Sequence, residues 1–365
     1  MADKNPLVSI CIPVFNRADL MRRTIESCIH QTYRNIEIVV VDNASTDNTR
    51  EVVLEYARKD PRVKYFRNDT NIGGGRNFLK CVEHASGEFA QPLGSDDWLS
   101  RNYIEEGVAQ FARYPDVAAI LANVLTFEFQ KNSSSFRFLD EMLIRPGTHS
   151  AEWFFRGIYL GGVGGTGFIS LMRREDVADA LRKVLENPVN LIQRAGLPEP
   201  FDMLIFLEVL ARYRSFFVTK NSAYIKSIHG HAHAGLQGNF FESRAGLIRY
   251  AAALRRAFES FFIHHGLQRH YQQLRFFNGL SIGINSSAVL LGKRIRKEER
   301  TDYVLTVKDF FKDYSKKEKW LMAAGALPYI VFKFLQRFKK LFMERSVFVP
   351  DPKYFLTADL HFKAE

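Results

Sequence analysis

Three short polar clusters within the first hundred residues each follow a run of apolar, strand-forming residues. They are Pro13–Arg17, Asp42–Asp47 and Ser95–Asp97. If the runs are parallel strands of one sheet, the clusters meet at the rim where α/β proteins bind ligands. A carboxylate such as Asp42 can there accept hydrogen bonds from a base edge or a ribose hydroxyl. Helix capping or a turn explains any one cluster equally well, but three clusters at one rim favour a ligand site.

The third cluster contains adjacent carboxylates, Asp96 and Asp97, which repel each other unless a cation or an arginine lies between them. Oxygen ligands of this kind suit Mn²⁺ or Mg²⁺, with water and phosphate oxygens completing the shell. Such an ion stabilises the negative charge that develops on a departing nucleoside diphosphate. The alternative is an exposed turn, because Ser-Asp-Asp is common in turns.

The elements that must position these clusters alternate regularly. Continuous apolar runs predict buried parallel strands, and segments with helical spacing of apolar residues lie between them. This alternation predicts an α/β protein with a doubly wound, mostly parallel sheet flanked by helices. The expected strands are 8–14, 36–42, 63–66, 88–93 and 117–129, and the expected helices are 19–31, 46–59, 76–85, 101–114, 176–186 and 203–213.

The chain resembles the family 2 glycosyltransferases with a GT-A fold. The resemblance covers roughly the first 115 residues and is specific because several motifs occur in the family's order. These motifs are Val8–Arg17, Ile29–Tyr33, Ile36–Thr49, Asn71–Asn77 and Ser86–Asp97. The resemblance implies that the nucleotide-sugar is held by Pro13, Asn16, Arg17, Asp42, Ser45, Arg76 and Asp96, with Asp96 as a metal ligand and Asp97 beside it.

One position departs from the family's pattern. The family often has Asp-x-Asp-Asp where this chain has Gly94-Ser95-Asp96-Asp97. The chain therefore lacks the first of the expected carboxylates.

The family's general base is usually an acidic residue at the start of a helix after the acceptor loop. Asp202 precedes an apolar helical segment and is the first choice for this base, with Glu199 as the second. Such a carboxylate takes the proton from the acceptor hydroxyl as it attacks the anomeric carbon, and one displacement of this kind inverts that carbon. The alternative is that Asp202 only caps the helix.

Three histidines alternate at positions 229, 231 and 233, where one side of a strand could present them to a metal. The resemblance implies a histidine near the diphosphate in this region, and His229 is the first choice as a ligand. The alternative is an exposed loop.

The charge is distributed unevenly along the chain. Residues 1–110 carry 14 Lys/Arg and 16 Asp/Glu, whereas residues 293–345 carry 15 Lys/Arg and 7 Asp/Glu. We therefore expect a transferase domain over 1–240, with a nucleotide-binding half (1–130) and an acceptor-binding half (131–240). A helical, basic extension follows over 241–365, and its segment 320–345 suits an anionic membrane surface. The alternative for that segment is a helix packed on the protein with a solvated basic face.

The scattered Cys11, Cys28 and Cys81 fit a reducing compartment, and no apolar run has the length of a membrane span. We expect a cytoplasmic protein, peripheral at the inner face of the membrane, without nucleic acid as a partner. The expected reaction is inverting sugar transfer from a nucleoside-diphosphate sugar, UDP by default, to a glycan or lipid-linked glycan. A nucleotidyltransferase would need a basic Gly-rich loop after the first strand, and a non-enzymatic binder of anionic surfaces would leave the acidic rim unexplained.

Overall fold

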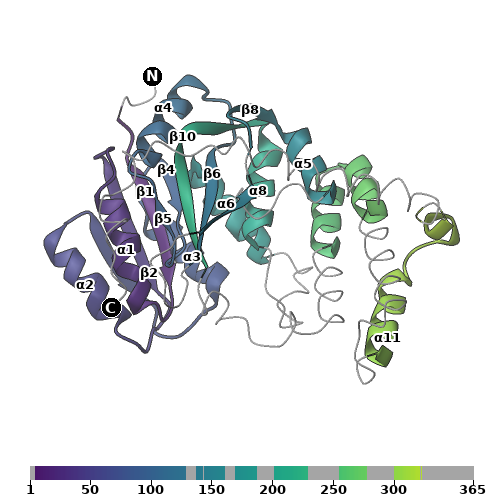
Figure 1. Cartoon of the computed structure of the whole chain (residues 1–365), viewed down its shortest axis with the longest axis horizontal. Coiled ribbons are helices and arrows are strands. Elements are labelled where there is room, and N and C mark those ends of the chain that lie inside the picture. Colours follow the sequence, from purple (N-terminus) through teal and green to yellow (C-terminus); the bar gives the residue numbers. More distant parts are fainter. Residues whose placement is uncertain are drawn as a thin grey trace.

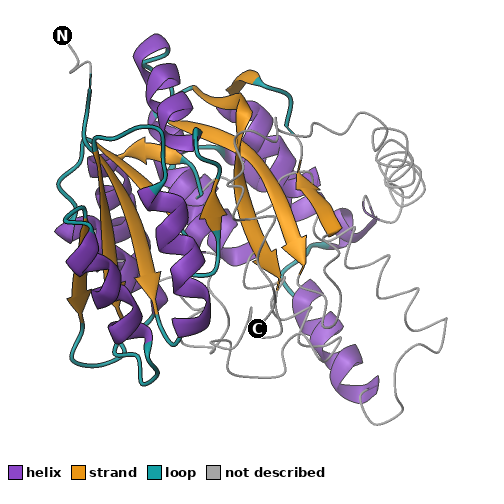
Figure 2. Ribbon diagram, turned by 60° about the vertical axis from the view of Figure 1, so that its left-hand side comes forward, coloured by secondary structure: helices purple, strands orange, loops and turns teal. Residues whose placement is uncertain are grey.

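The structure is a computed structural model, shown in Figures 1 and 2. It describes residues 5–128, 137–142, 144–160, 169–186, 201–228, 255–277, 300–320 and 322. The predicted Glu199, His229 and most of the segment 320–345 lie outside these residues.

One ten-stranded mixed sheet organises the molecule. Its order is β3-β2-β1-β4-β9-β6-β10-β5, with β7 on β6 and β8 on β10. The strands β3, β2, β1, β4, β6 and β10 run in one direction, and the other four run against them. The strands are β1 (Val8–Val14), β2 (Ile36–Asp42), β3 (Val63–Arg67), β4 (Phe89–Pro92), β5 (Trp98–Leu99), β6 (Ala119–Glu128), β7 (Arg137–Met142), β8 (Gly147–Ser150), β9 (Leu171–Arg173) and β10 (Ser215–Ile228).

Helices cover both faces of this sheet (Figure 2). One hydrophobic cluster lies under α1, α2 and α4, and another lies under α3, α5, α6 and α8. The helices are α1 (Ala18–Ile29), α2 (Thr49–Lys59), α3 (Gly74–His84), α4 (Tyr103–Arg113), α5 (Ala151–Leu160), α6 (Arg174–Glu186), α8 (Phe201–Arg212) and α11 (Arg300–Phe311). The predicted α/β sheet with helices on both faces is therefore confirmed.

Burial explains why the first two strands form where they do. Every residue of β2 is buried, and six of the seven residues of β1 are. Val8, Ile10 and Ile12 face one cluster, whereas Cys11 faces the other, so the strand needs apolar side chains on both sides. The two strands pair in parallel from Val8 opposite Ile36 to Val14 opposite Asp42. Their carboxyl ends therefore lie side by side.

The described helical residues 255–277 share the core of the sheet's second face. Phe258, Phe261, Phe262 and Leu274 belong to the same hydrophobic cluster as α5 and α8. Further along the chain, α11 lies far from α2, at the other end of the long axis in Figure 1. The first part of the predicted C-terminal extension is thus packed on the α/β core.

The three cysteines are all buried in this core. Burial raises the pKa of each thiol above its ordinary value, to about 12 for Cys28. Within the described part of the chain, no helix combines the length and apolarity needed to cross a membrane.

Candidate functional site

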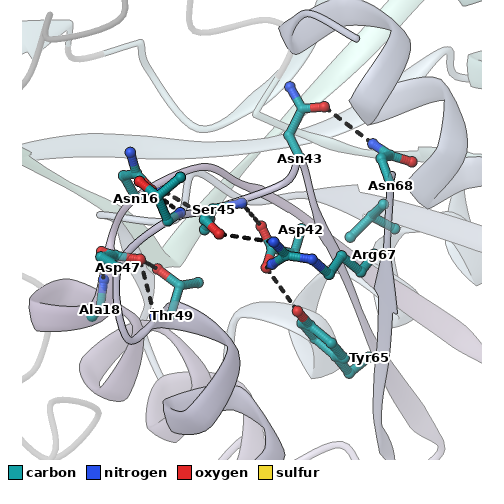
Figure 3. Close-up of polar contacts among 12 residues, drawn as sticks. Asn16, Ala18, Asp42, Asn43, Ser45, Asp47, Thr49, Tyr65, Arg67 and Asn68 are labelled. Carbon is teal, nitrogen blue, oxygen red and sulfur yellow. Dashed lines mark hydrogen bonds and ion pairs between the residues drawn. The ribbon is translucent and has the colours of Figure 1, made fainter. Parts of the chain in front are cut away.

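The ends of β1 and β2 are joined by hydrogen bonds between their polar clusters (Figure 3). The backbone N–H of Asn16 donates to Ser45 Oγ at 2.9 Å. The side-chain Oδ1 of Asn16 accepts from the backbone N–H of Thr46 at 2.8 Å. The backbone N–H of Asn43 donates to the Val14 carbonyl at 2.8 Å. The first two polar clusters of the sequence therefore form one surface at the strand ends.

This surface needs unusual backbone at two positions. Asn16 has φ of 52° and Ala44 has φ of 64°, both in the left-handed region. Asparagine tolerates this region better than most residues, whereas alanine gains nothing from its side chain there. With these left-handed residues, the backbone after β1 and the backbone after β2 each change direction within two residues of the strand end.

The Asp42 carboxylate is the buried centre of the surface. It is 0% exposed. Oδ1 accepts from the Ser45 amide at 2.8 Å, and Oδ2 accepts from Tyr65 Oη and Arg67 Nη1, each at 2.7 Å. Arg67 Nη2 also donates to the Ser45 carbonyl at 2.9 Å. Asp42 thus fixes the loop that follows β2, while the Arg67 side chain, 37% exposed, brings a positive charge to its edge.

A set of asparagine amides connects this surface to the start of α3. Asn43 Oδ1 accepts from the Asn68 side chain at 3.1 Å and from the Ile72 amide at 2.9 Å. Asn77 Nδ2 donates to the Val41 carbonyl at 2.9 Å, which anchors the first turns of α3 to β2. Arg76 lies exposed in the first turn of this helix. A guanidinium held on an anchored helix N-terminus beside a strand-end surface suits an anionic ligand.

The acidic turn, Gly94–Asp97, follows β4 on the other side of β1. Asp96 lies 3.9 Å from Arg17 Nε, with side-chain exposures of 22% for Asp96 and 18% for Arg17. The Thr24 hydroxyl of α1 donates to the Ser95 carbonyl at 3.1 Å. The structure therefore brings the acidic turn to the residues that follow β1, as the strand order predicts.

Asp97 points into the protein. It is 9% exposed, and its Oδ2 accepts a 2.7 Å hydrogen bond from Tyr224 Oη of β10. The same Tyr224 oxygen accepts from the Gly94 amide at 3.1 Å. The Oδ2 atom of Asp97 is therefore bound within the protein.

Asp202 lies in the first turn of α8, which begins at Phe201, two residues before the predicted start of this helix at 203. Its Oδ1 accepts from the Met203 amide at 2.7 Å. Burial raises the pKa of Asp202, although the Met203 amide and the charge of Lys226 act in the opposite direction. A carboxyl group in this setting has the raised basicity that a general base needs, and its Oδ1 is held by the amide of the next residue.

One face of β10 links Asp202 to the acidic turn. Tyr224 and Lys226 are two residues apart in a strand, so their side chains leave it on the same side. Tyr224 contacts Asp97, and the charge of Lys226 acts on Asp202.

Three residues of this region were not identified from the sequence. Tyr65 and Arg67 bond to Asp42 from β3, and Tyr224 bonds to Asp97 from β10. Parallel pairing of the predicted strands 36–42 and 63–66 would have brought Tyr65 and Arg67 close to Asp42, because Asp42 lies opposite Arg67 in the sheet. Nothing local indicated Tyr224, because 127 positions separate it from Asp97.

Asp96 is the described carboxylate that best fits a divalent ion. Within the described ranges, no group of three or more His, Cys, Asp or Glu side chains is placed to hold a metal. Mg²⁺-type ions commonly bind one or two carboxylates together with substrate phosphates and water. The donor set therefore fits an ion that arrives with a diphosphate rather than one held by the protein alone.

Sequence comparison identifies relatives for the N-terminal part of the chain. Residues 9–179 match the family described as Glycosyl transferase family 2. An uncharacterized glycosyltransferase of Haemophilus influenzae is 37% identical over 101 residues, 28% of this chain and 40% of the relative. The GalNAc(5)-diNAcBac-PP-undecaprenol beta-1,3-glucosyltransferase of Campylobacter jejuni is 38% identical over 95 residues, 26% of this chain and 31% of the relative. The chain thus matches less than half the length of either relative.

Structure comparison extends the likeness of fold along most of the chain. The crystal structure of S. aureus TarS 1-349 in complex with UDP-GlcNAc matches with a TM-score of 0.59 at 17% identity, covering 88% of each chain. The same protein in complex with UDP matches with a TM-score of 0.55 at 15% identity, again over 88% of each chain. At these identities the likeness concerns the fold, and the predicted GT-A fold is confirmed.

Proposed function

Because residues 9–179 match the family described as Glycosyl transferase family 2, we propose that this protein moves one sugar from a nucleoside-diphosphate sugar to a hydroxyl group of a glycan or lipid-linked glycan. The observation that carries the proposal is the joined rim of β1, β2 and β4. Asn16 and Ser45 are hydrogen-bonded there, and Arg17 lies 3.9 Å from Asp96. A nucleotide surface and a carboxylate for the diphosphate end thus adjoin each other.

The nucleotide is held by the surface after β1 and β2. Pro13, Asn16 and Ser45 shape it, and the Asp42 network keeps the loop rigid, so little ordering remains to be done on binding. Arg76 and Arg67 lie at its edges, where guanidinium groups suit phosphate oxygens or base acceptors. UDP is the first nucleotide to test.

The diphosphate is directed to Asp96. A divalent ion held between Asp96 and the diphosphate would neutralise the charge that develops as the bond to the sugar breaks. The sequence suggests His229 as a further ligand, whereas Asp97, which it also suggests, has its Oδ2 bonded to Tyr224 inside the protein. In the absence of substrate, Arg17 supplies a positive charge close to Asp96.

Asp202 acts as the base. It takes the proton from the acceptor hydroxyl while that oxygen forms a bond to the anomeric carbon and the bond to the diphosphate oxygen breaks. This single displacement inverts the anomeric carbon. The raised pKa of Asp202, caused mainly by burial, supports the assignment because a stronger base accepts the proton more readily.

The acceptor is proposed to be lipid-linked, as the printed name of the Campylobacter jejuni relative suggests for that enzyme. Trp320 is 69% exposed and follows exposed lysines at 316, 317 and 319, and Leu305 of α11 is 59% exposed. This combination of apolar side chains and positive charge supports contact with an anionic membrane surface at the cytoplasmic face. Absence of binding to anionic vesicles in low salt would remove this part of the proposal.

A thermal-shift experiment tests the proposal directly. We expect one of UDP, dTDP, GDP and CDP to stabilise the protein in the presence of Mn²⁺ and to lose most of this effect in Asp96→Asn. Asp116→Asn, at a turn far along the chain from the rim clusters, is the control and should leave the shift unchanged. The absence of a shift with every nucleotide, with and without Mn²⁺, would contradict the proposed function.

A further inference from the structure

Asp97 and Gly94 are bound to one atom of β10. Tyr224 Oη donates to Asp97 Oδ2 at 2.7 Å and accepts from the Gly94 amide at 3.1 Å. The Asp97 amide closes the turn by donating to the Gly94 carbonyl at 3.1 Å. Tyr224 is only 1% exposed, so it holds the turn from inside the protein.

Gly94 provides the space that this arrangement needs. A Cβ atom at position 94 would lie 2.6 Å from Asp97 Oδ2 and 3.1 Å from Asp96 Oδ1. Both distances are too short for ordinary packing, so any side chain at position 94 would displace the Asp97 carboxylate from Tyr224. The absence of a carboxylate at this position is therefore coupled to the inward orientation of Asp97.

The residues after the turn are also fixed to β10. Trp98 pairs with Ile225 and Leu99 with Tyr224 in an antiparallel bridge. The Ser100 amide donates to the Ala223 carbonyl at 3.0 Å, and the Ala223 amide donates to Ser100 Oγ at 2.9 Å. Asp97 thus lies between a tight turn and a short strand that are both attached to the same partner.

We propose that Asp97 is a positioning residue held by Tyr224, and that it orients the turn so that Asp96 presents its carboxylate to the diphosphate and its cation. The inference rests on the proposed function and assigns different tasks to the two adjacent carboxylates. Asp97 has its Oδ2 bound inside the protein, whereas Asp96 is 22% exposed and lies beside Arg17. Tyr224 is a positioning residue because it acts through the turn.

The decisive variant is Tyr224→Phe, with Tyr103→Phe as its matched control. Tyr103 is also buried, and its hydroxyl donates to the Ile169 carbonyl at 2.8 Å, away from the acidic turn. The Mn²⁺ concentration that gives half of the nucleotide-induced thermal shift should rise about tenfold in Tyr224→Phe, as expected for loss of one hydrogen bond to a charged group. It should stay at the wild-type value in Tyr103→Phe, although both variants lose some stability.

Nucleotide binding measured without Mn²⁺ distinguishes a specific effect on the acidic turn from a loss of folded protein. It should be the same in Tyr224→Phe and the wild type, because the surface after β1 and β2 is untouched. An unchanged Mn²⁺ requirement in Tyr224→Phe would overturn the proposal, as would nucleotide binding by the wild type that does not depend on Mn²⁺.

Gly94→Ala provides an independent test. It should raise the Mn²⁺ requirement by displacing Asp97, and the double variant with Tyr224→Phe should be no worse than the more affected single variant, because both changes break one contact. Fully additive effects would contradict the coupling between Gly94 and Tyr224.

Amide hydrogen exchange tests the contact without any ligand. In Tyr224→Phe, a peptide covering residues 93–100 should exchange faster than in the wild type and in Tyr103→Phe, because the Gly94 amide loses its acceptor. Unchanged exchange would refute the role of Tyr224. A wild type that binds no nucleoside diphosphate would instead remove the proposed function, while the exchange result would still decide whether Tyr224 holds the turn.

Discussion

Asp42 and Asp202 are both aspartates at the edge of the α/β core, but they lie in different surroundings. Asp42 is completely buried and receives hydrogen bonds from Ser45, Tyr65 and Arg67. Asp202 accepts from the amide of the next residue, and burial raises its pKa. The first carboxylate is thus compensated by an arginine and holds a loop in place. The second has a pKa above the ordinary value of an aspartate, as a general base requires.

The largest expected effect comes from Asp202→Asn. The amide oxygen of asparagine can still accept from the Met203 amide. We expect sugar transfer to fall by about 10²- to 10⁴-fold, the usual contribution of a general base, with the melting temperature nearly unchanged. Steady-state kinetics and thermal unfolding check this prediction. Wild-type activity in this variant would mean that Asp202 is not the base.

The pH profile of the wild type sharpens the same contrast. Since the folded-state pKa of Asp202 is raised, the acidic limb of kcat/KM should lie above the ordinary aspartate pKa of 3.8. The stability contribution of this group is present below that ordinary value and is lost as the pH rises through the raised pKa. An acidic limb at or below 3.8 would argue against Asp202 as the base.

Asp42→Ala should mainly affect stability. It leaves the Tyr65 hydroxyl, the Arg67 guanidinium and the Ser45 amide without their shared acceptor. Removing one partner from such a buried set costs about 3 kcal/mol, and urea unfolding measures this loss. Asp47→Ala, at a more exposed position of the same loop, should cost about 1 kcal/mol, as expected for a capping residue. Equal losses in the two variants would contradict the central role of Asp42.

Glu37, in β2, allows a smaller test, which concerns the pH dependence of stability. Burial raises the pKa of Glu37, but hydrogen bonds from Lys64, Ser9 and the Ser86 amide outweigh burial and lower it. The folded state therefore holds this proton less tightly than the unfolded chain does. The resulting stability is present above the ordinary pKa of 4.5 and is lost as the pH falls through the lowered value. Glu37→Gln should flatten the decrease in unfolding free energy measured between pH 6 and pH 3, a range of about three units chosen around that pKa.

The smallest predicted effect is stabilising. Ala44 has φ of 64°, where an L side chain is strained and glycine is not. Ala44→Gly should raise the unfolding free energy by about 0.5–1 kcal/mol, since relief of strain exceeds the extra entropy of glycine. Urea unfolding is again the measurement. A loss of stability would indicate that the alanine methyl group contributes packing that exceeds its strain.

The predicted strand bounds were right where burial on both faces leaves a continuous apolar run. The sequence predicted β1 and β2 residue for residue, because each is a continuous apolar run that is buried on both faces. The helix before β4 was expected from Arg76 and begins at Gly74, after Gly73 with φ of 85°. Local sequence thus determines these elements and much of the surface at their ends, which we propose binds the nucleotide.

The strands β9 and β10 were not predicted. β9 is three residues long, and the pairing of β10 with β6 shifts register between Val218 and Ala223, so neither gives a regular pattern. The contact between Tyr224 and Asp97 depends on these strands meeting in the folded chain. Long-range pairing, rather than local propensity, decides that half of the site.

The burial of the three cysteines has a practical consequence for spectroscopy. Thiol reagents attack the thiolate, and the raised pKa values of Cys11, Cys28 and Cys81 leave little of that form at neutral pH. A single cysteine introduced at exposed Leu305 or Trp320 would therefore react selectively with a fluorophore or a nitroxide. Because the native cysteines react slowly, the label at the introduced cysteine reports the distance of that position from a lipid surface.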